Sequence, residues 1–402
     1  MAGLLEGIRV VEVATFVAAP GAGTIMGDYG ADVVHVEPPG HGDPLRLLHL
    51  LQTLPDSEQP YAWMLEGRNK RSVVLDLKQA AGRDILKQLV ADADVFITNY
   101  QPDVAAELEV RYADLAPLNP RLVYAHVSGY GAAGAEAGRP GYDATAWWAR
   151  SGLMDLVRPR DGEVALSAPG MGDHPTALAL FGAIMAALFR RERTGRGGEV
   201  ATSLLASGLW ANGIMAQAAL CGAAAFKPIS HAEAPNPLVN VYRTGDGHHL
   251  FLAMVKEAFE WELFCTAIDR PDLKDDPRFA TSALRASNNV ALVAILDDVF
   301  AARAASAWSK VFDRHGVTHG LVQPYEALPD DPQAAANGLY PSYVDGGGLR
   351  TVDSPISIAG ETKRAPRMAP VLGQHTAEVL GEAGYDPAAI AALAADGIVV
   401  LG

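Results

Sequence analysis

Cysteine is nearly absent from this chain of 402 residues, which contains only Cys221 and Cys265. Two cysteines in so long a chain indicate a reducing compartment and no disulfide framework. Positive charge is also scarce, because 32 lysines and arginines stand against 47 aspartates and glutamates, for a net charge of −15. This balance argues against a nucleic acid or an anionic membrane as the main partner.

Long apolar segments are few. Charged residues such as Glu6 interrupt the amino terminus where a signal peptide needs an apolar core, so we expect no export and a cytoplasmic location. Residues 203–226 run for 24 residues without a charge, which is long enough to span a bilayer. They contain Gly208, Asn212 and Gln217, however, and therefore favour a helix buried between domains or subunits.

The common catalytic signatures are missing as well. The chain has no His-Glu-x-x-His, Cys-x-x-Cys, Gly-x-Ser-x-Gly or Walker motif, and its histidines show no ligand spacing, so we predict no metal site. Gly21, Gly23 and Gly27 follow the first predicted strand, but their spacing is one residue longer than in a dinucleotide fingerprint. They fit tight helix packing better than a nicotinamide cofactor, and a dehydrogenase stays open as a distant alternative.

What the first half does contain is an alternation of short apolar strands with helical segments. Strands are predicted over residues 8–16, 33–36, 72–77, 94–98 and 121–128, and helices over 20–29 and 80–91. This order predicts an α/β fold with a large, open, Rossmann-like parallel sheet, whose ligands bind beyond the carboxyl ends of the strands. The loops at those ends are Phe16-Val17-Ala18, Asn99-Tyr100-Gln101 and Ser128-Gly129-Tyr130-Gly131.

A smaller α+β domain is predicted over residues 227–330. Two strand-like segments, 239–242 and 250–253, flank a Thr-Gly-Asp-Gly turn, which is a strong hairpin signal. Helical patterns follow at 256–268 and 290–314.

The segment from Gly172 to Gly195 is the most informative in the chain. Its apolar residues recur at helical spacing, and Gly195 stands where a carboxy-terminal cap belongs. Asp173 therefore stands at the amino end of a buried helix, after Gly170 and Gly172, which would let a ligand approach the backbone. From this segment alone, a simple helix cap is the favoured explanation of Asp173, ahead of a functional carboxylate.

Several cations are grouped near predicted strands. Arg46 follows a Gly-Asp-Pro segment, and Arg68, Lys70 and Arg71 cluster just before a strand. Such a cluster is typical of a solvated face, but in so acidic a chain it also fits recognition of phosphates.

Taken in order, these segments resemble the family III CoA-transferases, a group that contains formyl-CoA transferase, carnitine CoA-transferase and the α-methylacyl-CoA racemases. The similarity covers nearly the whole chain and is specific because its markers keep their order and intervals. The markers are residues 30–39, 42–46, 68–77, 118–124, 139–143, 172–197, 276–279 and 372–376.

The resemblance implies a division of the chain and a mode of assembly. Residues 1–202 would form the first part of a large CoA-binding domain, and 203–226 a buried linker helix. The small domain would cover 227–330, and 331–402 would return as a linker and helices that complete the large domain. Two such chains would form a homodimer of interlocked rings.

The resemblance also implies the substrates and the site. A CoA thioester and a free carboxylic acid would be the substrates, with no permanently bound cofactor. Asp173 matches the catalytic aspartate, and the backbone at Gly172 and His174 would stabilise oxyanions. The expected CoA-contacting residues are Phe16, Val17, Ala18, Arg46, Gly67, Arg68, Asn69, Lys70, Asn99, Tyr100, Gln101, Tyr130, Gly131, Tyr142 and Asp143.

An aspartate suits this chemistry. A carboxylate with an ordinary pKa near 3.9 is ionised at neutral pH and can attack a thioester without a neighbouring base. Asp173 would form a mixed anhydride, then an aspartyl thioester with CoA, and the acceptor acid would reverse these steps.

Two departures from the family pattern concern the CoA phosphates. Glu107 stands where formyl-CoA transferase has an arginine, and Pro38 or Pro39 replaces a second one. Phosphate recognition would then fall to Arg46, Lys70 or Arg111. The glycine-rich lid of formyl-CoA transferase also has no counterpart in residues 253–259.

A racemase is the main alternative, because this family also contains enzymes that move an α-proton. Racemases have a histidine where this chain has Tyr142, and their second-domain glutamate falls at Lys256, next to Glu257. A phenol with a pKa of about 10 is a poor base at neutral pH, so transfer is favoured. A CoA-binding protein without activity is a third possibility, which an intact Asp173 argues against.

Overall fold

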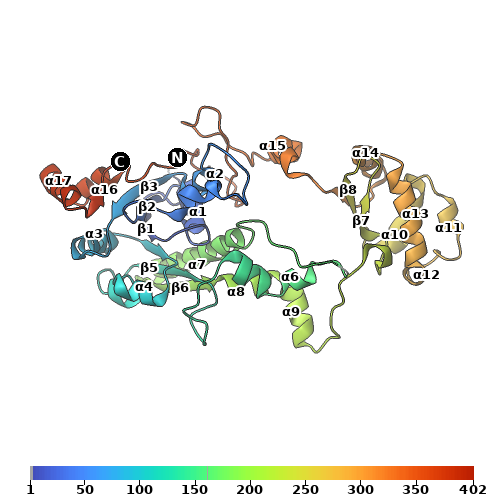
Figure 1. Cartoon of the computed structure of the whole chain (residues 1–402), viewed down its shortest axis with the longest axis horizontal. Coiled ribbons are helices and arrows are strands. Elements are labelled where there is room, and N and C mark those ends of the chain that lie inside the picture. The colour runs from blue at the N-terminus through green and yellow to red at the C-terminus, as the bar shows by residue number, and fades with distance from the viewer. Residues whose placement is uncertain (1–2, 161) are drawn as a thin grey trace. The chain divides into compact units, whose positions relative to one another are not determined.

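The chain divides into two compact units (Figure 1). The computed structural model describes residues 3–160 and 162–402. The large unit contains the residues up to Met154 together with Leu166–Ala223 and Pro332–Gly402, and the small unit contains Asp155–Ala165 and Ala224–Asp331.

A seven-stranded sheet forms the centre of the large unit, with the strand order β10-β3-β2-β1-β4-β5-β6. All neighbours pair in parallel except β10, which pairs antiparallel with β3. The order 3-2-1-4-5-6 is that of the Rossmann fold and reverses direction between β1 and β4. The strands are β1 Arg9–Val13, β2 Asp32–Glu37, β3 Lys70–Leu75, β4 Val95–Thr98, β5 Val123–Ser128, β6 Gly198–Ser203 and β10 Val399–Val400.

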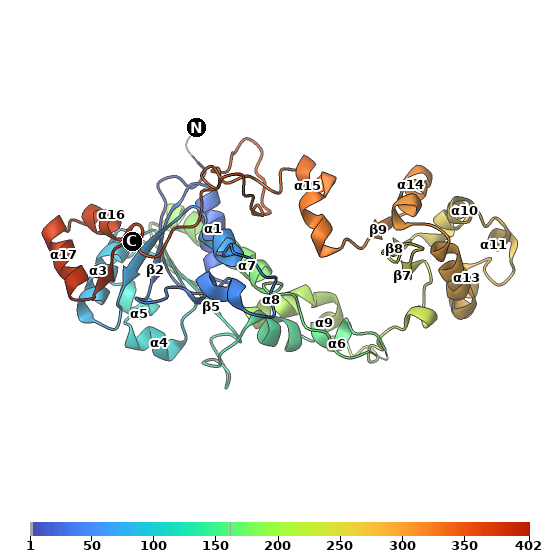
Figure 2. The ribbon, with the colours of Figure 1, turned by 45° about the horizontal axis from the view of Figure 1, so that its top comes forward.

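Helices cover both faces of this sheet. Side chains alternate between the two faces along each strand, and the apolar side chains on each face pack against helices. Val10 packs in a core with α1, α7 and α8, whereas Val11 and Val13 pack in a second core with α3, α16 and α17 (Figure 2). The α-helices of this unit are α1 Pro20–Asp28, α2 Tyr61–Gly67, α3 Ala80–Ala91, α4 Pro102–Glu107, α5 Tyr112–Leu115, α7 Asp173–Thr194, α8 Leu204–Ala211, α9 Gly213–Leu220, α15 Pro332–Ala336, α16 Thr376–Glu382 and α17 Pro387–Ala395, while α6 Leu153–Leu156 spans the boundary between the units.

The glycines of α1 serve close packing. A Cβ atom at Gly23 would lie 2.0 Å from Oε2 of Glu12, and one at Gly21 would lie 2.8 Å from Cβ of Ala177 on α7. The glycine spacing after β1 is thus explained by helix packing, and the dehydrogenase alternative loses the feature that suggested it.

The small unit has the predicted hairpin and one further strand. Strands β7 Val239–Arg243, β8 His249–Ala253 and β9 His319–Leu321 form an antiparallel sheet. Buried aromatic side chains, among them Phe264, Phe300 and Phe312, fill its core. The helices are α10 Glu257–Ala267, α11 Asp272–Asp275, α12 Ser282–Ser287, α13 Asn289–Ala301 and α14 Ala305–His315.

The predicted range of the large domain contains a short segment that belongs to the small unit, which the sequence did not indicate. Residues 155–165 fall inside the predicted range 1–202 but cluster with the small unit. The backbone N–H of Arg160 donates to the carbonyl of Ile229, and its guanidinium pairs with Glu233. These contacts attach the segment to the small unit.

The linker at 203–226 contains two helices rather than one. α8 ends at Ala211, and the side chain of Asn212 donates to the carbonyl of Ser151 over 2.8 Å. No residue of α9 is buried within the chain, and Trp210 and Ile214 are 88% and 87% exposed. Throughout the described residues, no helix has both the length and the apolar character needed to cross a membrane.

A buried charge network lies beneath the carboxyl edge of the sheet. Both ring nitrogens of His35 face carboxylates, Nδ1 at 2.6 Å from Glu12 and Nε2 at 3.4 Å from Asp43. Lys70 donates to the same oxygen of Glu12 over 2.8 Å. Burial by itself lowers the pKa of His35, but the nearby carboxylates of Asp43 and Glu12 outweigh it and raise the pKa to about 9.

We therefore expect the protein to lose stability as the pH rises from about 6.5 to about 9. A histidine whose pKa is raised by folding stabilises the fold fully below its unfolded pKa, and this contribution disappears as the pH passes the folded value. Denaturant unfolding across this range measures the loss. His35→Gln removes the titrating group, so the variant's stability should fall less over the same range. A parallel fall in both proteins would contradict this assignment.

Candidate functional site

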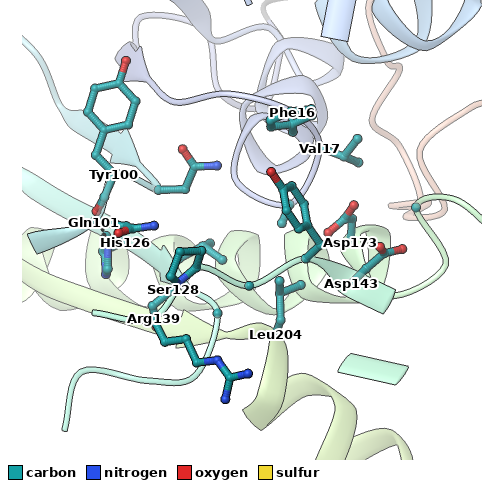
Figure 3. A pocket seen from close by; sticks show the side chains of 18 of the residues that line it. Phe16, Val17, Tyr100, Gln101, His126, Ser128, Arg139, Asp143, Asp173 and Leu204 are labelled. Atoms are coloured by element: carbon teal, nitrogen blue, oxygen red, sulfur yellow. Dashed lines mark hydrogen bonds between the residues drawn. The ribbon is translucent and has the colours of Figure 1, made fainter. Parts of the chain in front are cut away.

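A cavity of about 440 Å³ lies where the strand order reverses, beyond the carboxyl ends of β1, β4 and β5 (Figure 3). This is the position at which open α/β sheets bind their ligands. The predicted residues that line it are Phe16, Val17, Ala18, Asn99, Tyr100, Gln101, Tyr142, Asp143 and Asp173.

The remaining predicted site residues do not line the cavity. Tyr130 and Gly131 follow directly on Ser128 and Gly129, which do line the cavity. The others are Arg46, Gly67, Arg68, Asn69, Lys70, Gly172 and His174.

Asp173 is the first residue of α7, and its carboxylate faces the cavity. Burial, followed by the negative charges of Asp143 and Glu66, raises its pKa to about 7, while the neighbouring His174 acts to lower it. This differs from the ordinary carboxyl pKa expected from the sequence. The side chain is therefore a carboxyl group that gains and loses its proton near neutral pH.

Asp143 supplies the second carboxylate at this end of the cavity (Figure 3). It begins a π-helical turn over Asp143–Ala149, a geometry often found at functional sites. Its Oδ1 accepts from the N–H of Ala144 over 2.7 Å, whereas Oδ2 is buried with no hydrogen-bond partner in the described structure. The negative charge of Asp143 therefore opposes ionisation of Asp173.

The backbone before α7 is tightly held. The N–H groups of Asp173 and His174 both donate to the carbonyl of Gly170, so the His174 N–H expected to stabilise an oxyanion already has an acceptor here. A Cβ atom at Gly172 would lie 2.5 Å from the ring of Trp147. Gly172 is thus required because Trp147 packs directly against it.

The loop after β1 is held in a strained conformation. Phe16 has a φ of 63°, in the left-handed region, and its N–H donates to Asp43 over 3.1 Å. Asn99 bonds both the N–H and the carbonyl of Thr15, at 3.1 and 2.7 Å. The side chains of Asp43 and Asn99 therefore fix the wall of the cavity from two sides.

The cations expected to bind phosphates are largely occupied. Arg46 pairs through two bonds of 2.7 Å with Glu37, and Arg68 does the same with Asp28 at 3.0 and 2.7 Å. Lys70 is buried against Glu12, and Arg111 is paired with Asp114. These four cations neutralise carboxylates of their own chain, which leaves them poorly placed for a ligand.

Gly67 and Asn69 likewise have structural explanations. A Cβ atom at Gly67 would lie 2.8 Å from the ring of Trp63. Asn69 has a φ of 60° and bonds the N–H of Arg367 over 3.0 Å.

Lys78 is a cation that was missed from the sequence. A second cavity, of about 420 Å³, lies beyond β2 and β3 and shares Tyr100 with the first. Lys78 lines it together with Pro38 and Pro39, and no carboxylate of the described chain lies within ion-pair distance of its ammonium group. Its position after β3 was the available signal, because ligands bind beyond the carboxyl ends of strands and the cluster at Arg68 stands at the opposite end.

Known proteins resemble this chain over almost its full length. The model of CoA-transferase family III matches residues 5–376. The (R)-2-hydroxy-4-methylpentanoate CoA-transferase of Clostridioides difficile is 32% identical, over 95% of this chain and 96% of its own. The succinyl-CoA:glutarate CoA-transferase of Mus musculus is also 32% identical, over 98% of this chain and 90% of its own.

A solved structure agrees with these relatives. A CAIB/BAIF family protein from Brucella suis superposes with a TM-score of 0.85 at 28% identity, covering 95% of this chain and 100% of that one. The chain therefore belongs to CoA-transferase family III and is an enzyme that transfers CoA between acyl-CoA thioesters and carboxylic acids.

Proposed function

We propose that Asp173 carries the acyl group and then CoA during transfer. A carboxylate oxygen of Asp173 attacks the thioester carbonyl, the C–S bond breaks, and CoA leaves as the thiolate. The thiolate attacks the aspartyl carbonyl, the anhydride C–O bond breaks, and the first acid leaves as its carboxylate. The acceptor carboxylate then attacks the aspartyl thioester, and the same steps run in reverse to give the new acyl-CoA and free Asp173.

The position of Asp173 is the observation that supports this role. It is the titratable group at the amino end of α7 that faces the cavity, and the amino end of a helix favours developing negative charge. Apolar and aromatic residues such as Phe16, Val17 and Leu204 line the same cavity. They would limit the access of water, which hydrolyses an anhydride.

Asp173→Asn should lower kcat/KM by at least about 10³-fold, because an amide is not a nucleophile for this reaction. Asp155→Asn, which changes an exposed aspartate paired with Arg158, serves as the matched control. Hydroxylamine added during turnover should convert Asp173 of the wild type to a hydroxamate, which peptide mass spectrometry locates. Full activity in Asp173→Asn, or a modification elsewhere, would overturn the proposal.

The racemase alternative has a separate readout. Racemisation needs acid–base groups on both faces of the α-carbon, and Tyr142 lines the cavity where racemases have a histidine. The side chain of Glu257 lies outside the described residues. Rapid uptake of deuterium at the α-carbon without CoA exchange would favour the racemase.

We further propose that CoA extends across both cavities, with its nucleotide end near Lys78 and its thioester near Asp173. The two cavities share Tyr100, and the predicted segment Asn99–Gln101 lies along the first. The ammonium group of Lys78, which is free of carboxylate partners in the described chain, fits a phosphate of CoA.

Lys78→Met should raise the KM for an acyl-CoA about tenfold, which corresponds to about 1.4 kcal/mol of binding. With the matching acyl-pantetheine, which lacks the nucleotide, the variant and the wild type should have equal KM values. Lys87→Met is the control, because Lys87 is paired with Glu109 and lines neither cavity. Equal losses with both substrates would show that Lys78 does not bind the nucleotide end.

We propose that the working enzyme is a homodimer of interlocked rings, as the resemblance implies. Trp210, Ile214 and Leu220 are between 81% and 88% exposed on α8 and α9 of the single chain. Large apolar side chains that are this exposed on two successive helices favour a protein interface. A second copy of the chain would bury it.

Interlocked rings separate only when a chain unfolds, which distinguishes them from an ordinary dimer. We expect a mass of twice 42.4 kDa by light scattering. Two differently tagged preparations, mixed and incubated under native conditions, should form no hybrid dimers, whereas refolding the mixture from denaturant should form them. A monomeric mass, or hybrids without denaturant, would contradict this assembly.

A further inference from the structure

His174, next to the proposed nucleophile, is held in a way that requires a positive charge. Its Nδ1 lies 3.1 Å from the carbonyl oxygen of Gly170, and its Nε2 lies 2.9 Å from Oε1 of Glu66. Carbonyl and carboxylate oxygens only accept hydrogen bonds, so both ring nitrogens carry a proton. An imidazole with two N–H groups is an imidazolium.

Glu66 is a buried carboxylate fixed from another element. It lies on α2 and is 3% exposed. The hydroxyl of Thr24 on α1 donates to its carbonyl over 2.6 Å and lies 3.3 Å from Oε2. A Cβ atom at Gly21 would lie only 3.3 Å from the same Oε2, so the absence of a side chain there leaves room for the carboxylate.

The other titratable groups near Glu66 are bonded to other partners. Arg68 interacts electrostatically with Glu66, but its guanidinium is bonded to Asp28. Tyr343 also interacts electrostatically with Glu66, and its hydroxyl donates a hydrogen bond to the carbonyl of Met64. Glu66 is therefore left with His174 as the cation that it bonds directly.

Three charged side chains act on Asp173. Asp143 on the π-helical turn and Glu66 on α2 both oppose ionisation of Asp173, and His174 on α7 favours it. No other cation acts appreciably on Asp173 among the described residues. Against burial and these two negative charges, the charge of His174 is the contribution that makes the nucleophilic form of Asp173 more available.

We propose that Glu66 is a positioning residue that keeps His174 charged and oriented beside Asp173, so that the nucleophile holds its carboxylate form in a pocket that disfavours it. This inference rests on the proposed role of Asp173. The same ring also bonds the carbonyl of Gly170, which lines the cavity, and thereby keeps this carbonyl turned toward the helix.

The sign of the effect distinguishes this role from a purely structural one. The hydrogen bond to Glu66 is the largest contribution raising the pKa of His174. Glu66→Gln keeps the shape but removes the charge, so His174 should lose its proton nearer its ordinary pKa of about 6.5. Asp173 then loses a favourable cation, and this loss outweighs the relief from the more weakly acting charge of Glu66.

The test is the pH dependence of kcat/KM, which reports ionisation of the free enzyme. In the wild type we expect activity to rise through about pH 7 as Asp173 ionises. Glu66→Gln should move this rise upward by about half a pH unit, a modest shift because the half-exposed His174 is partly screened by solvent. The alkaline plateau should change by less than about twofold, which corresponds to less than about 0.4 kcal/mol.

The decisive comparison is the effect of Glu66→Gln in a protein that already lacks His174. His174→Gln removes the cation and should also move the rise upward. Adding Glu66→Gln to His174→Gln should then move it downward or leave it in place, because only the repulsion between Glu66 and Asp173 remains to be removed. Glu109→Gln, which neutralises an exposed glutamate paired with Lys87, is the matched control and should leave the profile unchanged.

A measurement without substrate keeps the test independent of activity. In protein labelled with ¹³C-histidine, the His174 resonance, assigned with His174→Gln, should titrate above its ordinary pKa in the wild type and lower in Glu66→Gln. A wild-type His174 that titrates at or below about 6.5 would overturn the inference. Shifts in the same direction in both backgrounds, or none in either, would overturn it too.

These outcomes are separable from failure of the proposed function. If no modification of Asp173 is trapped in the wild type, the proposed nucleophile is wrong. If Asp173 is trapped and the pH profiles do not follow the expected pattern, only the role of Glu66 is wrong.

Discussion

The large unit depends on pairing its buried carboxylates with cations from neighbouring strands and helices. Glu12 is matched by His35 and Lys70, Glu37 by Arg46, and Asp28 by Arg68. A buried charge without a partner costs several kcal/mol, so each pair constrains the elements that supply it. The loop after β1 is attached to this network through Asp43, which bonds the strained backbone of Phe16.

The same pairing explains why the cations most visible in the sequence are poor candidates for phosphate binding. A sequence shows that Arg46, Arg68 and Lys70 lie near the sheet, but it does not show that each faces a carboxylate from a distant segment. Glu12 and Lys70, for example, are 58 residues apart and meet only because β1, β2 and β3 are neighbours. Lys78 has no such ion-pair partner within the described chain, which is why we propose it, rather than these three, for a phosphate of CoA.

Local patterns predicted much of the fold and several of the residues that line the cavity. Residues 80–91 form a helix with the expected bounds, the hairpin pairs as expected, and Gly195 caps α7 with a φ of 72°. The two-residue strand β10 was missed because it is defined by pairing with β3 rather than by its own sequence. The raised pKa of Asp173 could not be predicted either, because it results from burial and from Asp143, 30 residues away in the sequence.

This raised pKa and the proposed chemistry have one physical cause. Burial and neighbouring negative charge destabilise the carboxylate of Asp173, and protonation removes the charge. Acylation removes it as well, because an aspartyl anhydride or thioester is neutral. The electrostatic environment that raises the affinity of Asp173 for a proton therefore raises its affinity for an acyl group. A stronger cation would stabilise the carboxylate too well for acylation, and the loss of the cation would raise the pKa of Asp173 further. A half-exposed histidine, charged through Glu66, lies between these limits.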